Sequence, residues 1–490
     1  MKNIIPILLL AFTMLLSLGL HISIFDKEIG GIHDWRQCQT AWNIRNFLRH
    51  DNNILNPRVA SFNGGKDNLY RYEFPIMQWS VAQAQRVFGE KVWVIRACMF
   101  VIGLFTLLGM YFLLRGVGLS ALMSSVGVWA FCFSPVFYYY TLNPLPDVFA
   151  LCMAVWYLVF FLRSTQTQQT SHMFWAGLFL SLSVAAKLPY ILFGGATFFY
   201  LMQRIIKNGL TDKSIFREIG VYLLLILPTA AWYAWVIPTW SNGVILGVFD
   251  NHISFAWACD ILYYHCYTMF PQILMNMACL PFLFLGIWFV LNKKTVQHKG
   301  FYPLLFVLAL IIAYFFYELN MIEKVHDYYM MPFLPFLFIL IAIGIAKVGS
   351  NTENKPLIAL SLFCLLLMPL LCLFQNKNAW TPQRLNSVYD NLAAFQNIGT
   401  RDEHVIMLND LSNYVLPYIL DKRGHIFKDN YLPRGWVWDM AVNYNIKYMF
   451  SDSRPVEATI QDYIQDTVYT AGEFKVFKFK DVEVLKGMGQ

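Results

Sequence analysis

Long apolar segments recur along this chain, and polar residues are concentrated in the stretches between them. A hydrocarbon core of about 30 Å is crossed by roughly 20 apolar residues, at about 1.5 Å of helix per residue. The first segment resembles a secretory signal, but no Ala-x-Ala-like cleavage site follows it, so we expect an uncleaved span. The pattern predicts a polytopic α-helical membrane protein with about eleven membrane-spanning helices, over residues 4–20, 92–114, 120–140, 147–163, 172–187, 190–206, 219–237, 271–291, 301–317, 330–346 and 356–374.

The charges of the connecting segments predict the topology. With Lys2 on the cytoplasmic side, the even-numbered connections are also cytoplasmic, and they obey the positive-inside rule. The net charge of +7 is then a topology signal, and no nucleic-acid binding is predicted. We expect residues 21–91, 238–270 and 375–490 on the periplasmic or extracellular side of a cytoplasmic (inner) membrane. The basic residues that carry this assignment are Arg115, Arg163, Arg204, Lys207, Lys213, Arg217, Lys293, Lys294, Lys299, Lys347 and Lys355.

The long polar segments have patterns of their own. In the first external loop, apolar residues recur at helical spacing over 38–50 and 75–88, which predicts helices lying along the membrane surface. The tail alternates strand-like and helical runs, which predicts a small α/β domain. We therefore expect a transmembrane domain over 1–374 and an external domain over 375–490. A disulfide between Cys259 and Cys266, both outside the spans, is left open.

The placement of ionisable residues separates two classes of function. The chain is 57% hydrophobic and 14% charged, and the middles of the spans are nearly free of charge. The ionisable residues that lie at or near the external ends of the spans are Arg96, Asp147, Lys187, Glu318, His326 and Asp327. A transporter or pump places such groups near the bilayer midplane, whereas an enzyme acting on a lipid-linked head group needs them at the interface. The pattern favours an enzyme with its site at the outer membrane surface.

Asp34 is the most informative of these residues. It lies in the run His33-Asp34-Trp35-Arg36, after two glycines and just before a predicted helix. An Asp in this position often caps a helix N-terminus. A fixed carboxylate at the membrane surface also suits a general base, because a hydroxyl is a poor nucleophile until its proton is accepted. The residues alone leave both interpretations open, and His33 and Arg36 are candidates for substrate contacts.

Asp147 and Lys187 have two interpretations each. Asp147 follows Pro146 and opens the fourth span, so it either caps that helix or helps to hold an acceptor or a divalent cation. Lys187, before Leu188-Pro189, either extends its side chain to the outer surface or neutralises a phosphate that becomes the leaving group.

The run His326-Asp327-Tyr328-Tyr329 precedes the tenth span. It is either part of an aromatic belt or a set of donors to phosphate oxygens, and Glu73, in Tyr72-Glu73-Phe74-Pro75, is a weaker candidate of the same kind. No pair of possible ligands has the spacing of a zinc site. We predict no metal ligands and no certain cofactor, with a divalent cation left open.

In their order and common external side, these residues resemble the GT-C superfamily of membrane glycosyltransferases. The similarity is greatest to the branch of the dolichyl-phosphate-mannose protein mannosyltransferases and the aminoarabinose transferase of lipid A. It covers residues 1 to about 350 and rests on His33-Asp34-Trp35-Arg36-Gln37, Tyr72-Glu73-Phe74-Pro75, Pro146-Asp147, Lys187-Leu188-Pro189 and His326-Asp327-Tyr328-Tyr329.

This resemblance implies a GT-C fold, a donor sugar linked to a polyprenyl phosphate, an Asp of the first loop as base, and inversion at the anomeric carbon. Asp34 would be the base, and Lys187 and His326 would lie near the donor phosphate. Two departures leave the acceptor and the phosphate contacts open. Trp35 stands where many members have a second acid, and Tyr72-Glu73-Phe74-Pro75 replaces a Lys-Pro-Pro motif.

We expect a hexosyl- or pentosyltransferase that uses a polyprenyl-phosphate-linked sugar and a lipid, glycan or protein acceptor, in contact with membrane lipids. A polysaccharide polymerase or ligase predicts an Arg-rich central external loop, and residues 238–270 contain neither Arg nor Lys. A transporter or flippase for lipid-linked glycans predicts polar or broken helices at mid-membrane, and a structural scaffold is a third alternative. The sequence leaves the identity of the sugar open.

Overall fold

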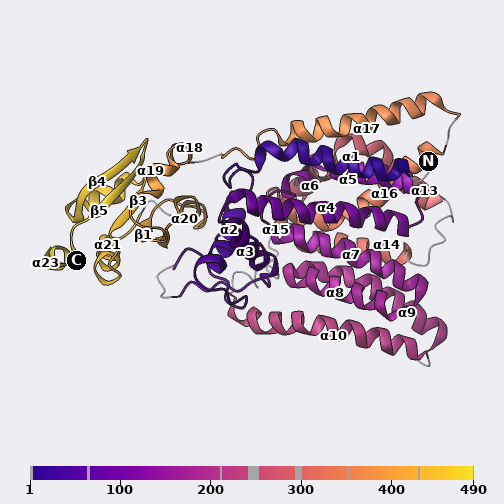
Figure 1. Ribbon diagram of the computed structural model, residues 1–490, viewed down its shortest axis with the longest axis horizontal. Coiled ribbons are helices and arrows are strands. Elements are labelled where there is room, and N and C mark those ends of the chain that lie inside the picture. Colours follow the sequence, from indigo (N-terminus) through magenta and orange to yellow (C-terminus); the bar gives the residue numbers. More distant parts are fainter. Residues whose placement is uncertain are drawn as a thin grey trace. The chain divides into compact units, whose positions relative to one another are not determined.

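The computed structural model describes residues 4–62, 67–209, 212–240, 253–292, 301–350, 353–382, 385–428 and 431–488. Its contacts divide the chain into two compact units (Figure 1). The helical unit contains Met1–Phe25, Tyr72–Met77 and Ile95–Lys377. The mixed unit contains Asp26–Arg71, Gln78–Val94 and Asn378–Gln490.

The helical unit is built almost entirely of apolar helices. Every segment expected to span a membrane falls on helical structure. The main helices are α1 (Ile4–His21), α4 (Val92–Gly116), α5 (Ala121–Cys132), α6 (Pro135–Tyr140), α7 (Pro146–Thr167), α8 (Thr170–Ala186), α9 (Gly195–Asn208), α10 (Lys213–Val236), α12 (Phe255–Tyr264), α13 (Leu280–Asn292), α14 (Phe301–Tyr317), α15 (Leu319–Ile322), α16 (Leu334–Gly349) and α17 (Lys355–Asn376). Shorter helical turns are η2 (Leu188–Gly194), η4 (His265–Leu274) and η6 (Asp327–Phe333).

Helix length decides how many crossings the described residues support. Six stretches are long and apolar enough to cross a membrane, and a seventh results if the pair Phe255–Leu274 and Met277–Asn292, bent by 93°, is one span. The count of about eleven crossings stays a prediction. The six stretches are Ile4–Ile24, Val92–Gly116, Pro146–Thr167, Lys213–Thr239, Asp327–Gly349 and Lys355–Asn376.

Two of the expected spans are broken for identifiable reasons. Between α5 and α6, the Ser134 hydroxyl accepts a hydrogen bond from the Phe137 N–H and Pro135 begins a new helix, which is the normal chemistry of a helix start. Between η4 and α13, Asn276 has a φ of 82°, a conformation that ends a helix. Cys259 and Cys266, on either side of the boundary between α12 and η4, are free and exposed.

Close helix packing in this unit depends on glycine. A Cβ atom on Gly286 of α13 would lie 2.0 Å from the Leu340 carbonyl oxygen, and one on Gly344 of α16 would lie 1.9 Å from that of Phe282. Only residues without a Cβ allow two helix backbones to approach this closely. Figure 1 shows α7, α8 and α10 side by side in the same unit.

The tail of the chain forms a five-stranded mixed sheet in the order β2-β1-β3-β5-β4. The parallel strands are β1 (His404–Met407), β2 (Arg423–Ile426) and β3 (Tyr448–Ser451), and the antiparallel strands are β4 (Ile464–Ala471) and β5 (Phe474–Phe479). Buried residues such as Ile406, Met449 and Phe477 form its core. The helices around it are α18 (Asn386–Tyr389), α19 (Leu392–Gln396), α20 (Val415–Leu420), α21 (Arg434–Asn443), α22 (Arg454–Thr459) and α23 (Val482–Met488). The predicted α/β character of the tail is confirmed.

Most of the first loop packs in the same unit as this sheet. The helices expected there are present as α2 (Asp34–Arg49) and α3 (Ile76–Phe88). Ser61 forms a parallel bridge to Gly424 of β2, so the loop pairs with the edge strand of the sheet and covers it. The two units are defined by contacts within the folded chain, and these contacts do not show whether either unit folds on its own. The domain division expected after residue 374 therefore stays a prediction.

Candidate active site

One candidate site lies in the helical unit and is centred on Lys187. The Lys187 ammonium nitrogen is 3.1 Å from Glu73 Oε1 and 3.6 Å from Asp147 Oδ1. The Lys187 and Asp147 side chains are 10% and 2% exposed, so water screens these ion pairs weakly. The structure therefore joins three residues that the sequence singled out separately.

Backbone hydrogen bonds place these residues together. The Phe74 N–H donates to the Ala185 carbonyl at 2.9 Å, which attaches the segment carrying Glu73 to the end of α8. Lys187 is the extended residue that follows that helix. Asp147 lies in the first turn of α7 after Pro146, where a carboxylate also interacts favourably with the helix dipole.

Aromatic side chains cover the lysine. The Lys187 ammonium lies 5.1 Å from the ring centre of Tyr329 and 5.9 Å from that of Tyr328, both within cation–π range. The His326 ring contacts both tyrosine rings, and its Nδ1 donates to the Met321 carbonyl at 2.8 Å. The predicted His-Asp-Tyr-Tyr run thus belongs to the same cluster as Lys187.

Two buried residues that the sequence did not single out for this site support the cluster. The hydroxyl of Tyr140 donates to Asp327 Oδ1 at 2.6 Å. Arg96, which is fully buried, donates to Asn143 Oδ1 at 2.7 Å and so holds the turn before Asp147. Arg96 was noted only as a charge at the end of a span, and a buried arginine needs a fixed partner.

The Lys187 cluster, as built, is not a simple phosphate site. Its ammonium already faces two carboxylates, so the local formal charge is negative when all three are ionised. A phosphate would compete with Glu73 and Asp147 for the lysine. This competition is a feature that the sequence interpretation did not contain.

Asp34 lies in the mixed unit, at the first residue of α2. Its Oδ1 accepts a hydrogen bond from the Trp35 N–H at 2.7 Å, and Arg36 donates to Gln39 Oε1 at 2.5 Å. His33, with a φ of 53°, precedes the helix in the left-handed conformation. His33, not Asp34, occupies the N-cap position of α2, and Asp34 is the first residue of the helix. The capping interpretation is therefore not what the structure shows, and the role of Asp34 as base stays a prediction.

The glycines before Asp34 have a steric reason. Gly31 has a φ of +92°, and a Cβ there would lie 1.9 Å from the Ala379 carbonyl oxygen. The neighbouring Ile32 N–H donates to that same oxygen at 3.0 Å. Only glycine fits this close approach, and the contact fixes the chain just before α2.

Asp34 and Trp35 line a cavity of about 620 Å³. The rest of its wall comes from loops that follow the parallel strands of the sheet, together with Leu385. The sequence interpretation missed these loop residues, although polar residues directly after strand-like runs were a usable signal. They are Asn409, Asp410, Leu411, Ser412, Tyr414, Val415, Lys428 and Asp452.

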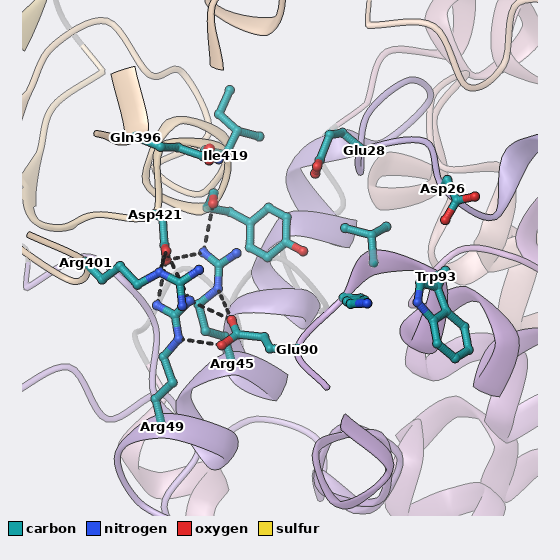
Figure 2. A pocket seen from close by; sticks show the side chains of 13 residues that line it. Asp26, Glu28, Arg45, Arg49, Glu90, Trp93, Gln396, Arg401, Ile419 and Asp421 are labelled. Atoms are coloured by element: carbon teal, nitrogen blue, oxygen red, sulfur yellow. Dashed lines mark hydrogen bonds and ion pairs between the residues drawn. The ribbon is translucent and has the colours of Figure 1, made fainter. Parts of the chain in front are cut away.

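A second cavity of the mixed unit, about 360 Å³, is lined by a network of charges at the other end of α2. Figure 2 shows Arg45, Arg49 and Arg401 pointing toward Asp421. Their nitrogens lie 3.2, 2.6 and 3.4 Å from the carboxylate oxygens of Asp421. Arg49 also donates to Glu90 Oε1 at 2.6 Å. The network joins α2 to the end of α20.

The arginines around Asp421 set its protonation. Burial acts to raise the pKa of Asp421, but the charges and hydrogen bonds of Arg45 and Arg49 outweigh burial and hold this pKa below its ordinary value. A depressed carboxyl pKa adds stability above the ordinary Asp value of about 4, and that stability is lost as the pH falls through the folded-state value. We expect the ion pairs that hold α2 against the end of α20 to weaken only under acidic conditions. Amide hydrogen exchange of residues 34–49, measured between pH 3 and 7, would test this.

Asp421→Asn should loosen α2 at neutral pH. The substitution leaves the guanidinium groups facing a neutral amide, and loss of one partner of a buried ion pair costs about 3 kcal/mol. We expect faster amide exchange over residues 34–49. Asp462→Asn is the matched control, because Asp462 and its partner Arg434 are 45% and 38% exposed and such pairs contribute about 0–1 kcal/mol. Equal exchange in the two variants would contradict this role of Asp421.

No group of three or more His, Cys, Asp or Glu side chains suited to a metal ion occurs among the described residues. Whether a divalent cation takes part stays open, as in the sequence interpretation.

Comparison with known proteins adds independent evidence. Residues 73–232 match the family model described as dolichyl-phosphate-mannose-protein mannosyltransferase, a range that includes Glu73, Asp147 and Lys187. No curated protein sequence matches the chain.

Solved structures resemble the whole chain. ArnT from Cupriavidus metallidurans in its apo state is 12% identical with a TM-score of 0.64, covering 95% of this chain and 97% of that one. ArnT bound to undecaprenyl phosphate is 12% identical with a TM-score of 0.62, covering 97% and 98%. The Archaeoglobus fulgidus oligosaccharyltransferase in its apo form is 14% identical with a TM-score of 0.59, covering 91% and 69%.

This chain has the GT-C fold. The resemblance drawn from its sequence motifs is confirmed, and together with its apolar helices the fold makes it a multi-pass membrane protein. The ArnT likeness extends through the tail, beyond the part of the chain that the sequence motifs covered. The proteins whose structures share this fold are glycosyltransferases.

Proposed function

We propose that this chain is a glycosyltransferase of the cytoplasmic membrane. It moves a sugar from a polyprenyl-phosphate donor to a hydroxyl group of a lipid, glycan or protein acceptor on the periplasmic or extracellular face. The observation that carries the proposal is the GT-C fold along almost the whole chain, shared with an ArnT whose structure holds undecaprenyl phosphate. The match of residues 73–232 to a sugar-transferase family supports the same reaction class.

The reaction needs a base and a stabilised leaving group. In the proposal, Asp34 accepts the proton of the acceptor hydroxyl while its oxygen attacks the anomeric carbon from the face opposite the phosphate. The bond between that carbon and the phosphate oxygen breaks, and the electron pair leaves with the polyprenyl phosphate. Configuration at the anomeric carbon is thereby inverted.

Lys187 and His326 would stabilise the negative charge that develops on the phosphate. Because Lys187 contacts Glu73 and Asp147, the phosphate would have to displace one of these carboxylates. Tyr328 and Tyr329 would keep the ammonium in place during the exchange.

Mass spectrometry of envelope glycans and glycolipids tests the proposal. Cells that lack the gene should lose one sugar increment from one class of molecule, and the wild-type gene should restore it. Identical glycan profiles with and without the gene would overturn the proposal. Flux of a lipid-linked sugar across proteoliposomes without any glycosyl product would instead support a flippase.

A further inference from the structure

We propose that the cavity beside Asp34 is an acceptor site that binds a neutral, hydroxyl-rich sugar residue. The inference rests on the proposed function and names the chemical class of its acceptor. It assigns the tail sheet of the mixed unit a direct part in binding that acceptor.

The position of the cavity is that of a ligand site in an α/β sheet. Asn409 and Asp410 follow β1, Lys428 follows β2, and Asp452 follows β3, and all four line the cavity. These three strands are parallel neighbours, so their carboxyl ends lie at one edge of the sheet. Ligands of open α/β sheets bind in crevices at this edge.

The size of the cavity fits a sugar. Its volume of about 620 Å³ lies in the range of roughly 300–1,000 Å³ that is common for small-molecule sites. Asp34, the proposed base, and Trp35 form part of the same wall. A sugar held there would share the cavity with the group that must receive its proton.

The chemistry of the wall suits hydroxyl groups. Carboxylate, amide and hydroxyl side chains can accept or donate hydrogen bonds to several hydroxyls at once, and Trp35 and Tyr414 offer aromatic surface for the C–H faces of a sugar ring. Asp452 Oδ1 is buried and has no hydrogen-bond partner within the described part of the chain. A buried acceptor without a donor is costly, so this oxygen is a contact point for a ligand hydroxyl.

Asp410 differs from Asp452 in this respect. It accepts hydrogen bonds from the Ser412 N–H at 3.0 Å, the Ser412 hydroxyl at 2.7 Å and the Leu416 N–H at 2.9 Å. These bonds commit its carboxylate to holding the loop after β1. Asp410 is therefore a positioning residue, and Asp452 is the binding residue.

The charge of the cavity favours a neutral acceptor over the donor phosphate as its ligand. Among the described residues that line the cavity, Asp34, Asp410 and Asp452 are acidic and Lys428 is the one basic residue. Burial raises the pKa of Asp410, which lessens the negative charge, but the two other carboxylates still outnumber the lysine. A phosphate would be repelled here, whereas a neutral sugar would not.

Saturation-transfer NMR on the full-length protein in detergent tests the proposal. The neutral probes are maltotriose, chitobiose and mannobiose, and the anionic probe is glucose 6-phosphate. We expect transfer to at least one neutral sugar and none to the phosphate. Asp452→Ala should reduce the neutral-sugar signal at least fivefold, and Asp452→Asn, which retains one acceptor oxygen, should reduce it less.

The matched control is Asp466→Ala, which removes an exposed carboxylate from β4, the edge strand farthest from β2 in the sheet. This variant should leave the signal unchanged. Undecaprenyl phosphate binding, followed by native mass spectrometry, should be the same in all variants. Absence of transfer to every neutral probe, preference for glucose 6-phosphate, or an unchanged signal in Asp452→Ala would each overturn the acceptor site. Absence of undecaprenyl phosphate binding in the wild-type protein would count against the proposed function and not against the acceptor site.

Discussion

Asp34→Asn should abolish sugar transfer. The amide keeps the size of the side chain but cannot accept the proton of the attacking hydroxyl, and a positioned general base contributes about 10²–10⁴-fold to the rate. We expect product formation from a polyprenyl-phosphate sugar to fall by that factor in membranes that contain equal amounts of the two proteins. The measurement is the initial rate of product release at saturating donor.

The structural role of Asp34 at the start of α2 must be separated from its role as base. An uncharged side chain at a helix N-terminus costs about 0.3–1 kcal/mol through the helix dipole, too little to prevent folding. Asp34→Glu keeps the charge and should retain more activity than Asp34→Asn. Asp466→Asn, on β4, should be fully active. A near-normal rate for Asp34→Asn would rule out Asp34 as the base.

The helices of this protein could be predicted from sequence because a membrane span needs a long apolar run. The breaks within the runs were harder to see. Ser134-Pro135 and Asn276 interrupt the expected third and eighth spans, since each combines a helix-starting or left-handed residue with apolar neighbours on both sides. A hydropathy average over a whole span does not detect one such residue, whereas the backbone conformation at that residue does.

The candidate residues could also be found from sequence, but their pairings could not. Glu73 and Lys187 are 114 positions apart, and nothing local indicates that the two side chains meet. The cavity wall at Asp452 depends on sheet order, because β3 lies beside β1 although β2 comes between them in sequence. Sequence patterns predict the strands, but the site depends on which strands pair with each other, and local sequence does not indicate that pairing.

Lys187→Met should destabilise the helical unit and weaken binding of the donor. The substitution leaves Glu73 and the almost fully buried Asp147 facing each other without the ammonium between them. Loss of one partner from a buried ion pair costs about 3 kcal/mol. We expect a lower melting temperature in detergent and at least a tenfold weaker affinity for undecaprenyl phosphate.

A double mutant separates the two effects of Lys187. In Lys187→Met/Glu73→Gln, one of the two carboxylates that lost their ion-pair partner is replaced by a neutral amide. The melting temperature should therefore rise part of the way back to that of the wild-type protein. The double-mutant cycle should show a coupling free energy of about 0.5–3 kcal/mol between the two residues. If the ammonium also contacts the donor phosphate, affinity for undecaprenyl phosphate must stay low while stability recovers. Recovery of both together would mean that Lys187 only holds the cluster in shape, because removing the carboxylate restores the fold but cannot replace a missing positive charge.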